Sequence, residues 1–142
     1  MMTKPEPVFD GHNDVLLRLY LKGGDQPEAD FVDGDGVGHL DLPRAMAGGM
    51  AAGLFAIFVP SLPSDADEDV NALMRQPQYD VPLPPNVGCS SALTVTLSMA
   101  ALLFRIERQS GGRLKICRNA GDITDAVAAG STVRSAVWLT KL

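Results

Sequence analysis

Short apolar runs alternate with amphipathic segments along this chain. The runs are bounded by glycine, proline or charged residues, which predicts strands over 7–10, 53–60, 113–117 and 135–140. The segments between them repeat apolar residues at helical spacing, which predicts helices over 14–21, 41–49, 90–109 and 122–130. Strands that alternate with helices predict parallel strands joined by crossover connections, and therefore an α/β fold.

The same periodicity predicts what each element buries. We expect the first helix to bury Leu16, Leu17, Tyr20 and Leu21, and the long helix to bury Leu93, Leu97, Ala100 and Phe104 with Leu103 alongside. The continuous apolar run 53–60 is typical of a strand that is buried on both faces. Asp41 and Asp122 precede their helices as N-caps, and Asn13 or Asp14 caps the first one.

Two stretches carry little periodicity. The Gly- and Asp-rich segment 25–39 predicts a loop, and 61–88 predicts a long connection in which the acidic cluster at 65–69 starts a short helix. The sequence stops on its last predicted strand, and a complete eight-stranded barrel takes about 250 residues. The chain is therefore about half a barrel if it is a barrel, and a small parallel α/β binding domain is the other fold that the order allows.

Composition and charge exclude several classes of protein. The 142 residues carry a formal net charge of −5 and no dense cluster of Lys and Arg, which argues against a nucleic-acid-binding protein. The apolar piece 92–104 is shorter than the roughly 20 residues of a spanning helix, so we expect a buried helix and no membrane span. The first seven residues have no apolar signal-peptide core, so we expect a cytoplasmic protein.

A histidine and an aspartate follow the first predicted strand. His12 and Asp14 are two positions apart, and in an extended segment such residues point the same way. An imidazole nitrogen and a carboxylate oxygen are both zinc ligands, and parallel α/β folds place their chemistry at the carboxyl ends of strands. The spacing alone equally allows a polar turn in which the aspartate caps the helix. Both interpretations stay open at this point.

The remaining candidates give weaker signals. The stretch from Asp33 to Gly38 lacks the later ligands of a calcium loop and predicts a solvated turn. His39 is either a pocket residue or a surface-loop histidine. Cys89 and Cys117 are too few for a disulfide framework or a Cys-rich zinc site, and we expect buried thiols.

Four stretches resemble the zinc peptidases of family M19, the renal or membrane dipeptidases, and most closely the bacterial members. They are "VFDGHND" from Val8, "GHLDLPRAMAGGMAAGLFAIFVPS" from Gly38, "MAALLFRIERQSGGRLKICRNAGDI" from Met99 and "DAVAAG" from Asp125. The resemblance implies the N-terminal half of a TIM-like (β/α)8 barrel of the metal-dependent hydrolase type, with a two-zinc centre that hydrolyses dipeptides. The His-x-Asp pair that binds one zinc in this family matches His12 and Asp14.

The resemblance is strongest over residues 8–130 and stops in the tail 131–142, so we expect a single incomplete domain. The family has a His-x-Glu-Gly motif on its next strand, and Lys141 stands where the bridging glutamate would be. We hypothesise a frameshifted or truncated gene product, which the other reading frames of the coding DNA beyond Gly130 would test.

Coordination chemistry limits what such a chain can do. Two ligands do not make a catalytic zinc site, so we expect weak zinc binding and negligible dipeptidase activity from this chain. The alternative to a dipeptidase is a non-catalytic remnant, or a half-barrel that needs a separate C-terminal partner. Self-association into a homo-oligomer stays open.

Overall fold

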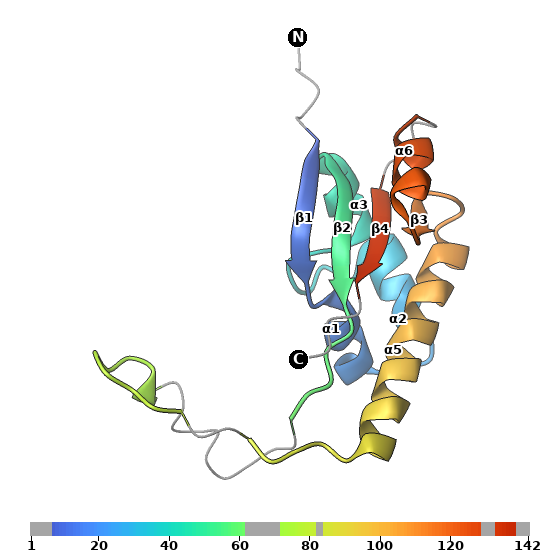
Figure 1. Cartoon of the computed structure of the whole chain (residues 1–142). Helices are drawn as coiled ribbons and strands as arrows, with labels where there is room; N and C mark the ends of the chain where they lie inside the picture. Colours follow the sequence, from blue (N-terminus) through green and yellow to red (C-terminus); the bar gives the residue numbers. More distant parts are fainter. Residues whose placement is uncertain (1–6, 62–71, 82–83, 129–132, 139–142) are drawn as a thin grey trace.

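A four-stranded parallel sheet forms the centre of the molecule (Figure 1). The structure is a computed structural model that describes residues 7–61, 72–81, 84–128 and 133–138, with the backbone alone for 126–128 and 133–138. The strands are β1 (Val8–Asn13), β2 (Met50–Ala56), β3 (Leu114–Cys117) and β4 (Val133–Trp138). All three pairs of neighbouring strands are parallel, which confirms the predicted α/β architecture.

The strand order is β1-β2-β4-β3, so β4 lies between β2 and β3. In a (β/α)8 barrel each strand instead lies beside the strands before and after it in the chain. The described strands therefore form an open sheet and not the sequential arc that half a barrel predicts. The observed order gives the six-residue β4 a partner on both sides and leaves the four-residue β3 at an edge. A short edge strand exposes few unpaired backbone groups.

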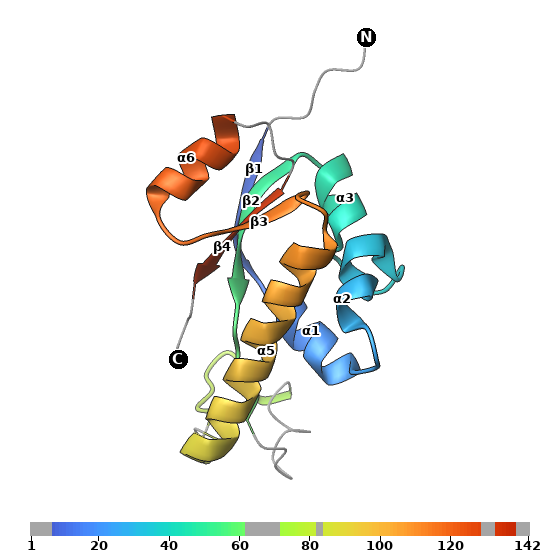
Figure 2. The same ribbon diagram turned by 90° about the vertical axis from the view of Figure 1, so that its right-hand side faces the viewer.

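Helices cover the two faces of the sheet unequally. Figure 2 shows α1, α2 and α3 on one side and α6 on the other. The helical elements are α1 (Val15–Lys22), α2 (Pro27–Ala29), the π-helical η1 (Asp30–Gly34), α3 (Leu42–Ala47), α5 (Cys89–Gln109) and α6 (Ala120–Ala128). The core lies between the sheet, α1, η1, α3 and α5, and its largest fully buried side chains include Phe31, Phe55, Leu16, Leu19 and Met99.

The loop predicted over 25–39 is wrong in its central part. That part forms α2 and η1, and η1 buries Phe31 and Val32 completely in the core. Glycine and aspartate on either side of these two apolar residues obscured a helical segment too short to show a period. The acidic cluster predicted to start a helix at 65–69 lies outside the described residues.

Helix starts follow local hydrogen bonds. Asp41 caps α3 as predicted, because its carboxylate accepts a hydrogen bond from the Arg44 backbone N–H at 2.8 Å. The predicted cap at Asp122 is wrong by three residues. The side chain of Asn119 accepts from the backbone N–H of Asp122 at 3.0 Å, so α6 begins at Ala120.

The predicted faces of two helices need correction. In α5 the buried residues are Met99, Leu102, Leu103 and Ile106, whereas Leu93, Leu97 and Phe104 are 50–59% exposed. In α1 Leu19 is buried and Leu21 is 65% exposed. Both helices are apolar around much of their circumference, so periodicity does not select the face that packs.

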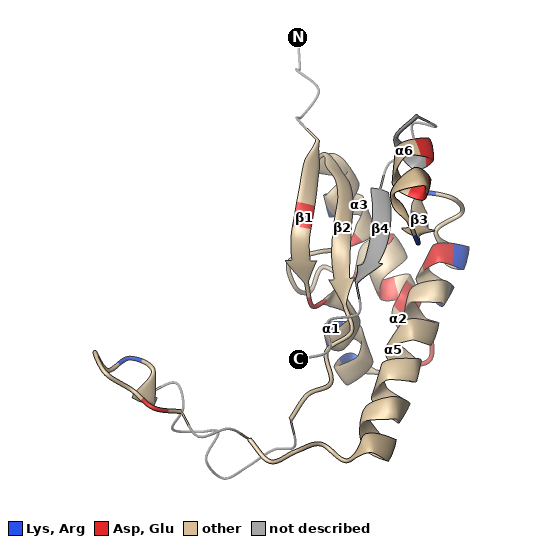
Figure 3. Cartoon of the chain, in the orientation of Figure 1, with Lys and Arg blue, Asp and Glu red and all other residues tan. Residues whose placement is uncertain are grey.

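The part of α5 over residues 89–104 contains no charged residue. Figure 3 shows charged residues of α5 only toward its carboxyl end. By length and composition α5 could cross a membrane, and a single such helix is weak evidence for a membrane span.

One of the two thiols predicted to be buried is exposed. Cys89, the first residue of α5, is exposed, whereas Cys117 in β3 is buried as predicted.

Candidate metal site

A bulge shapes the carboxyl end of β1. The strand continues three residues beyond its predicted end, through Gly11, His12 and Asn13. Asp10 pairs with Gly53 and Asn13 pairs with Phe55, so β1 uses three residue steps where β2 uses two. Such bulges bend a strand and redirect its side chains. The bulge therefore lies at the residues that carry the candidate chemistry.

Side-chain hydrogen bonds of Asp10 and Asn13 hold this bulge. The Asp10 carboxylate accepts from the His12 backbone N–H at 3.3 Å and from the Asn13 side-chain amide at 2.8 Å. The same amide donates to the carbonyl oxygen of Leu54 in β2 at 3.3 Å. Gly53 lies opposite this arrangement in β2, and a Cβ there would touch the Asp10 side chain at 3.4 Å from its Cβ.

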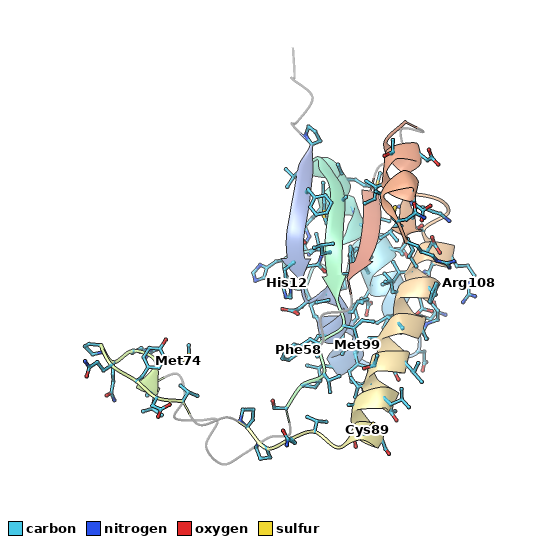
Figure 4. The ribbon with its side chains drawn as sticks, in the orientation of Figure 1. His12, Phe58, Met74, Cys89, Met99 and Arg108 are labelled. Atoms are coloured by element: carbon cyan, nitrogen blue, oxygen red, sulfur yellow. The ribbon has the colours of Figure 1, made fainter. Side chains whose placement is uncertain are left out.

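His12 and Asp14 are brought together beyond the bulge. The His12 Nε2 lies 3.3 Å from the Asp14 Oδ1, and the two side chains are 57% and 53% exposed. Figure 4 shows His12 at the carboxyl end of β1, with its ring pointing away from the sheet. The pair is thus open to solvent at the end of the sheet where parallel α/β folds place their chemistry.

The carboxylate of Asp14 is not used as a helix cap. Asp14 occupies the N-cap position of α1 but makes no side-chain capping hydrogen bond, and the backbone N–H of Val15 instead donates to the Asn13 side chain at 3.4 Å. The capped-turn interpretation therefore fails for Asp14, and its oxygens stay available to a ligand.

The donor spacing fits a zinc ion. Two ligands about 2.0–2.1 Å from a tetrahedral zinc lie about 3.3–3.4 Å from each other. The His12–Asp14 distance falls at that value, and it also suits an ion pair when the imidazole is protonated. Among the described side chains no group of three or more His, Cys, Asp or Glu could hold a metal ion. Lys141, which stands where the family resemblance places the bridging glutamate, lies outside the described residues.

A pocket of about 320 Å³ adjoins the site between β1 and α3. Its lining includes His12 and Asp10 from β1 and His39 from the loop before α3. His39 is exposed, as expected of a loop histidine, and it also faces the same pocket as His12. The rest of the lining includes the apolar side chains of Val8, Leu40, Ala45 and Met50.

Arg44 fixes the loop that carries His39. Its guanidinium donates to the Asp41 carboxylate at 2.7 Å and to the carbonyl oxygens of Gly38 and Val37 at 2.9 and 3.2 Å. The Asp41 side chain at this contact is only 4% exposed. The backbone around His39 is therefore held from the α3 side.

The turn that begins at Asp33 is largely exposed as predicted, but ion pairs hold its Asp35 carboxylate, which the prediction did not include. The Asp35 carboxylate lies 2.8 Å from the Lys22 ammonium and 3.0 Å from the Arg18 guanidinium, and its side chain is 8% exposed. The hydrogen bond from Lys22, then that from the backbone N–H of Val37, holds the pKa of Asp35 well below its usual value. Sequence patterns missed this contact because its partners come from α1.

Known proteins are similar to this chain over nearly all of its length. A sequence model described as "Membrane dipeptidase (Peptidase family M19)" matches residues 1–139. A protein of Acinetobacter calcoaceticus, "Uncharacterized protein in PQQ-III 3'region", is 34% identical over 128 residues, which are 90% of this chain and 38% of that protein.

Two crystal structures of similar proteins superpose closely. One is the dipeptidase AC, a metallo peptidase of family M19, which is 41% identical with a TM-score of 0.82 over 96% of this chain. The other is a metallo peptidase from Rhodobacter sphaeroides liganded with a phosphinate mimic of the dipeptide L-Ala-D-Ala, which is 42% identical with a TM-score of 0.83 over the same share. This chain spans only 37–38% of the length of either relative.

Proposed function

The chain belongs to peptidase family M19, the membrane dipeptidases, and we propose that its His12–Asp14 pair serves the zinc-dependent hydrolysis of dipeptides. The observation that carries the proposal is the 3.3 Å separation of the His12 Nε2 and the Asp14 Oδ1 at the carboxyl end of β1. The dipeptide mimic in the Rhodobacter sphaeroides relative supports the substrate class.

In this proposal His12 and Asp14 hold one zinc ion and transfer no proton. A bound zinc would lower the pKa of a water ligand toward neutrality and polarise the peptide carbonyl. Asp10 does not bind the ion in this proposal. Its carboxylate holds the His12 backbone and thereby sets the direction of the imidazole.

A second candidate function follows from the number of donors. A catalytic zinc needs three protein ligands and an open position, and the described side chains contribute two at this site. The chain by itself would then be a non-catalytic protein, or one part of a site that a separate polypeptide completes. Zinc binding and hydrolysis must accordingly be measured separately.

An NMR titration with ZnCl₂ tests the metal site. We expect the imidazole resonances of His12 to shift at millimolar zinc while those of His39 stay in place, which makes His39 an internal control. Asp14→Asn should weaken the effect by about tenfold, because it removes the charged ligand. Equal shifts of both histidines, or an unchanged response in Asp14→Asn, would contradict the proposed ligands.

A hydrolysis assay with L-Ala-D-Ala separates the two candidates. We expect negligible zinc-dependent hydrolysis by the 142-residue chain. Measurable hydrolysis that His12→Ala abolishes would establish a complete site within this chain and exclude the need for a separate polypeptide.

A further inference from the structure

β3 lies at one edge of the sheet, and side chains from the carboxyl end of α5 cover its outer side. Among the described strands β3 pairs with β4 alone. The backbone N–H groups of Leu114 and Ile116 donate to side chains of the α5 end, so both groups point away from β4. Figure 2 shows this end of α5 beside β3. An edge strand ordinarily leaves such groups open to a further strand.

Glu107 makes the contact in the middle of this edge. Its carboxylate accepts a hydrogen bond from the Ile116 backbone N–H at 2.8 Å, and the Lys115 ammonium lies 3.4 Å from the same oxygen. Ile116 is only 6% exposed. The glutamate oxygen therefore occupies the position that the carbonyl oxygen of an added strand would take.

Ser110 makes the contact at the start of the edge. Its hydroxyl oxygen accepts from the Leu114 backbone N–H at 3.1 Å, and its hydrogen is donated to the Glu107 carbonyl oxygen at 2.7 Å. The Leu114 carbonyl oxygen lies 3.2 Å from the same hydroxyl. Ser110 is the C-cap residue of α5 and is almost fully buried. The helix that precedes β3 thus supplies both of the side chains that cover it.

We infer that Glu107 and Ser110 form an edge cap that prevents β3 from pairing with β3 of a second copy of this chain. The cap occupies the two outward N–H groups through which an added strand would bind. This inference does not depend on the proposed function, because β3 and β1 lie at opposite ends of the sheet order.

Symmetry makes a second copy the strand that fits this edge. Two identical edges related by a two-fold axis pair in antiparallel fashion. With Lys115 on the axis, Leu114 of each copy faces Ile116 of the other, so every outward group of this four-residue strand meets a partner. The same pairing places two Lys115 ammonium groups opposite each other, which opposes it further.

Two conservative variants test the cap. Glu107→Asp keeps the charge but shortens the side chain by one methylene, whereas Glu107→Gln removes the charge and keeps an oxygen at full reach. In dilute Glu107→Asp we expect the Ile116 amide to exchange about tenfold faster, because a buried donor has lost its acceptor. We expect self-association of this variant, measured by sedimentation, to strengthen by about tenfold, and Glu107→Gln to stay near wild type.

The opposite ranking contradicts the cap. Self-association of Glu107→Gln that equals or exceeds that of Glu107→Asp would show that charge, and not the hydrogen bond, keeps the copies apart. No increase in Glu107→Asp would show that the edge is closed without the glutamate. Either result overturns the inference.

The Ile116 amide also locates the contact between the copies. As the concentration of Glu107→Asp rises, this amide should regain protection, because the second copy then accepts its hydrogen bond. Adding Leu97→Lys should leave the association unchanged, since Leu97 belongs to the exposed apolar surface of α5. Association without protection of Ile116, or its loss on Leu97→Lys, assigns the contact to another surface and overturns the inference.

Glu28→Ala is the matched control. Glu28 in α2 also pairs with α5, since its carboxylate lies 3.0 Å from the Arg105 guanidinium, and its side chain is 14% exposed against 25% for Glu107. Glu28→Ala should change neither the exchange of the Ile116 amide nor the self-association. An effect equal to that of Glu107→Asp would mean that the loss of any glutamate contact loosens α5, which overturns the edge cap.

Discussion

β1 and β2 are neighbours in one parallel sheet, yet their environments are opposite. In β2 Ala52, Phe55 and Ala56 are at most 4% exposed, whereas in β1 Val8 and Phe9 are more than half exposed. β2 is buried and supports its neighbour β1. β1 is an edge strand whose polar side chains are open to solvent. The candidate site therefore depends on β2 for its position and on β1 for its reactive groups.

Removing the aromatic ring from each strand should give the largest contrast. Phe55 is fully buried and contacts Phe31 edge to face, with ring centroids 5.9 Å apart. Phe55→Ala should lower the free energy of unfolding by about 3–5 kcal/mol through the lost burial and the cavity. Phe9→Ala should change it by no more than about 0.5 kcal/mol. Urea unfolding followed by circular dichroism measures both, and similar losses would show that β1 is buried after all.

Adding one methyl group to a glycine of each strand should give effects of opposite sign. A Cβ on Gly53 in β2 would collide with the end of the buried Met50 side chain, and one on Gly11 in β1 would meet nothing within 4 Å. Gly53→Ala should cost about 1 kcal/mol, because the methionine can move aside only in part. Gly11→Ala should stabilise by about 0.5 kcal/mol by restricting the unfolded chain. Destabilisation by both variants, in the same urea experiment, would indicate that the bulge tolerates no side chain at Gly11.

The contrast between these strands also shows what the sequence could predict. Continuous apolar residues predicted that β2 is buried on both faces, and the Asp41 cap was readable because its partner is three residues away. The residues of the candidate site, His12 and Asp14, were named from their spacing and from the family resemblance. The capping bond and the approach of His12 to Asp14 involve residues at most three positions apart, so the local sequence indicates them.

The remaining features depend on residues that are distant in the chain. The bulge that orients His12 needs the Leu54 carbonyl, which lies 41 positions from its donor, Asn13. The position of β4 between β2 and β3 depends on how strands that are distant in the chain pair with one another, which no local pattern indicates. The buried face of α5 was mispredicted for the same reason, since contact with α1 and β3 selects it from two apolar stripes.

The smallest expected contrast between a variant and its control concerns the bulge itself. Asp10→Ala removes the acceptor for the His12 backbone N–H and for the Asn13 amide, so we expect a loss of about 1 kcal/mol in the free energy of unfolding. We also expect faster exchange of the His12 amide and a weaker response of its ring to zinc. Exchange and zinc titration by NMR, together with urea unfolding, measure these changes.

Two controls decide whether the effect belongs to the bulge. Asp33→Ala removes an exposed carboxylate of η1 and should leave the His12 amide unchanged, whereas Asp10→Asn keeps one side-chain oxygen and should restore part of its protection. An equal response of His12 in Asp33→Ala would mean that overall charge, and not the Asp10 contact, controls the end of β1. If His12 responds to Asp10→Ala alone, then the conformation of the end of β1 depends on the hydrogen bond between the Asp10 carboxylate and the His12 backbone and not on overall charge.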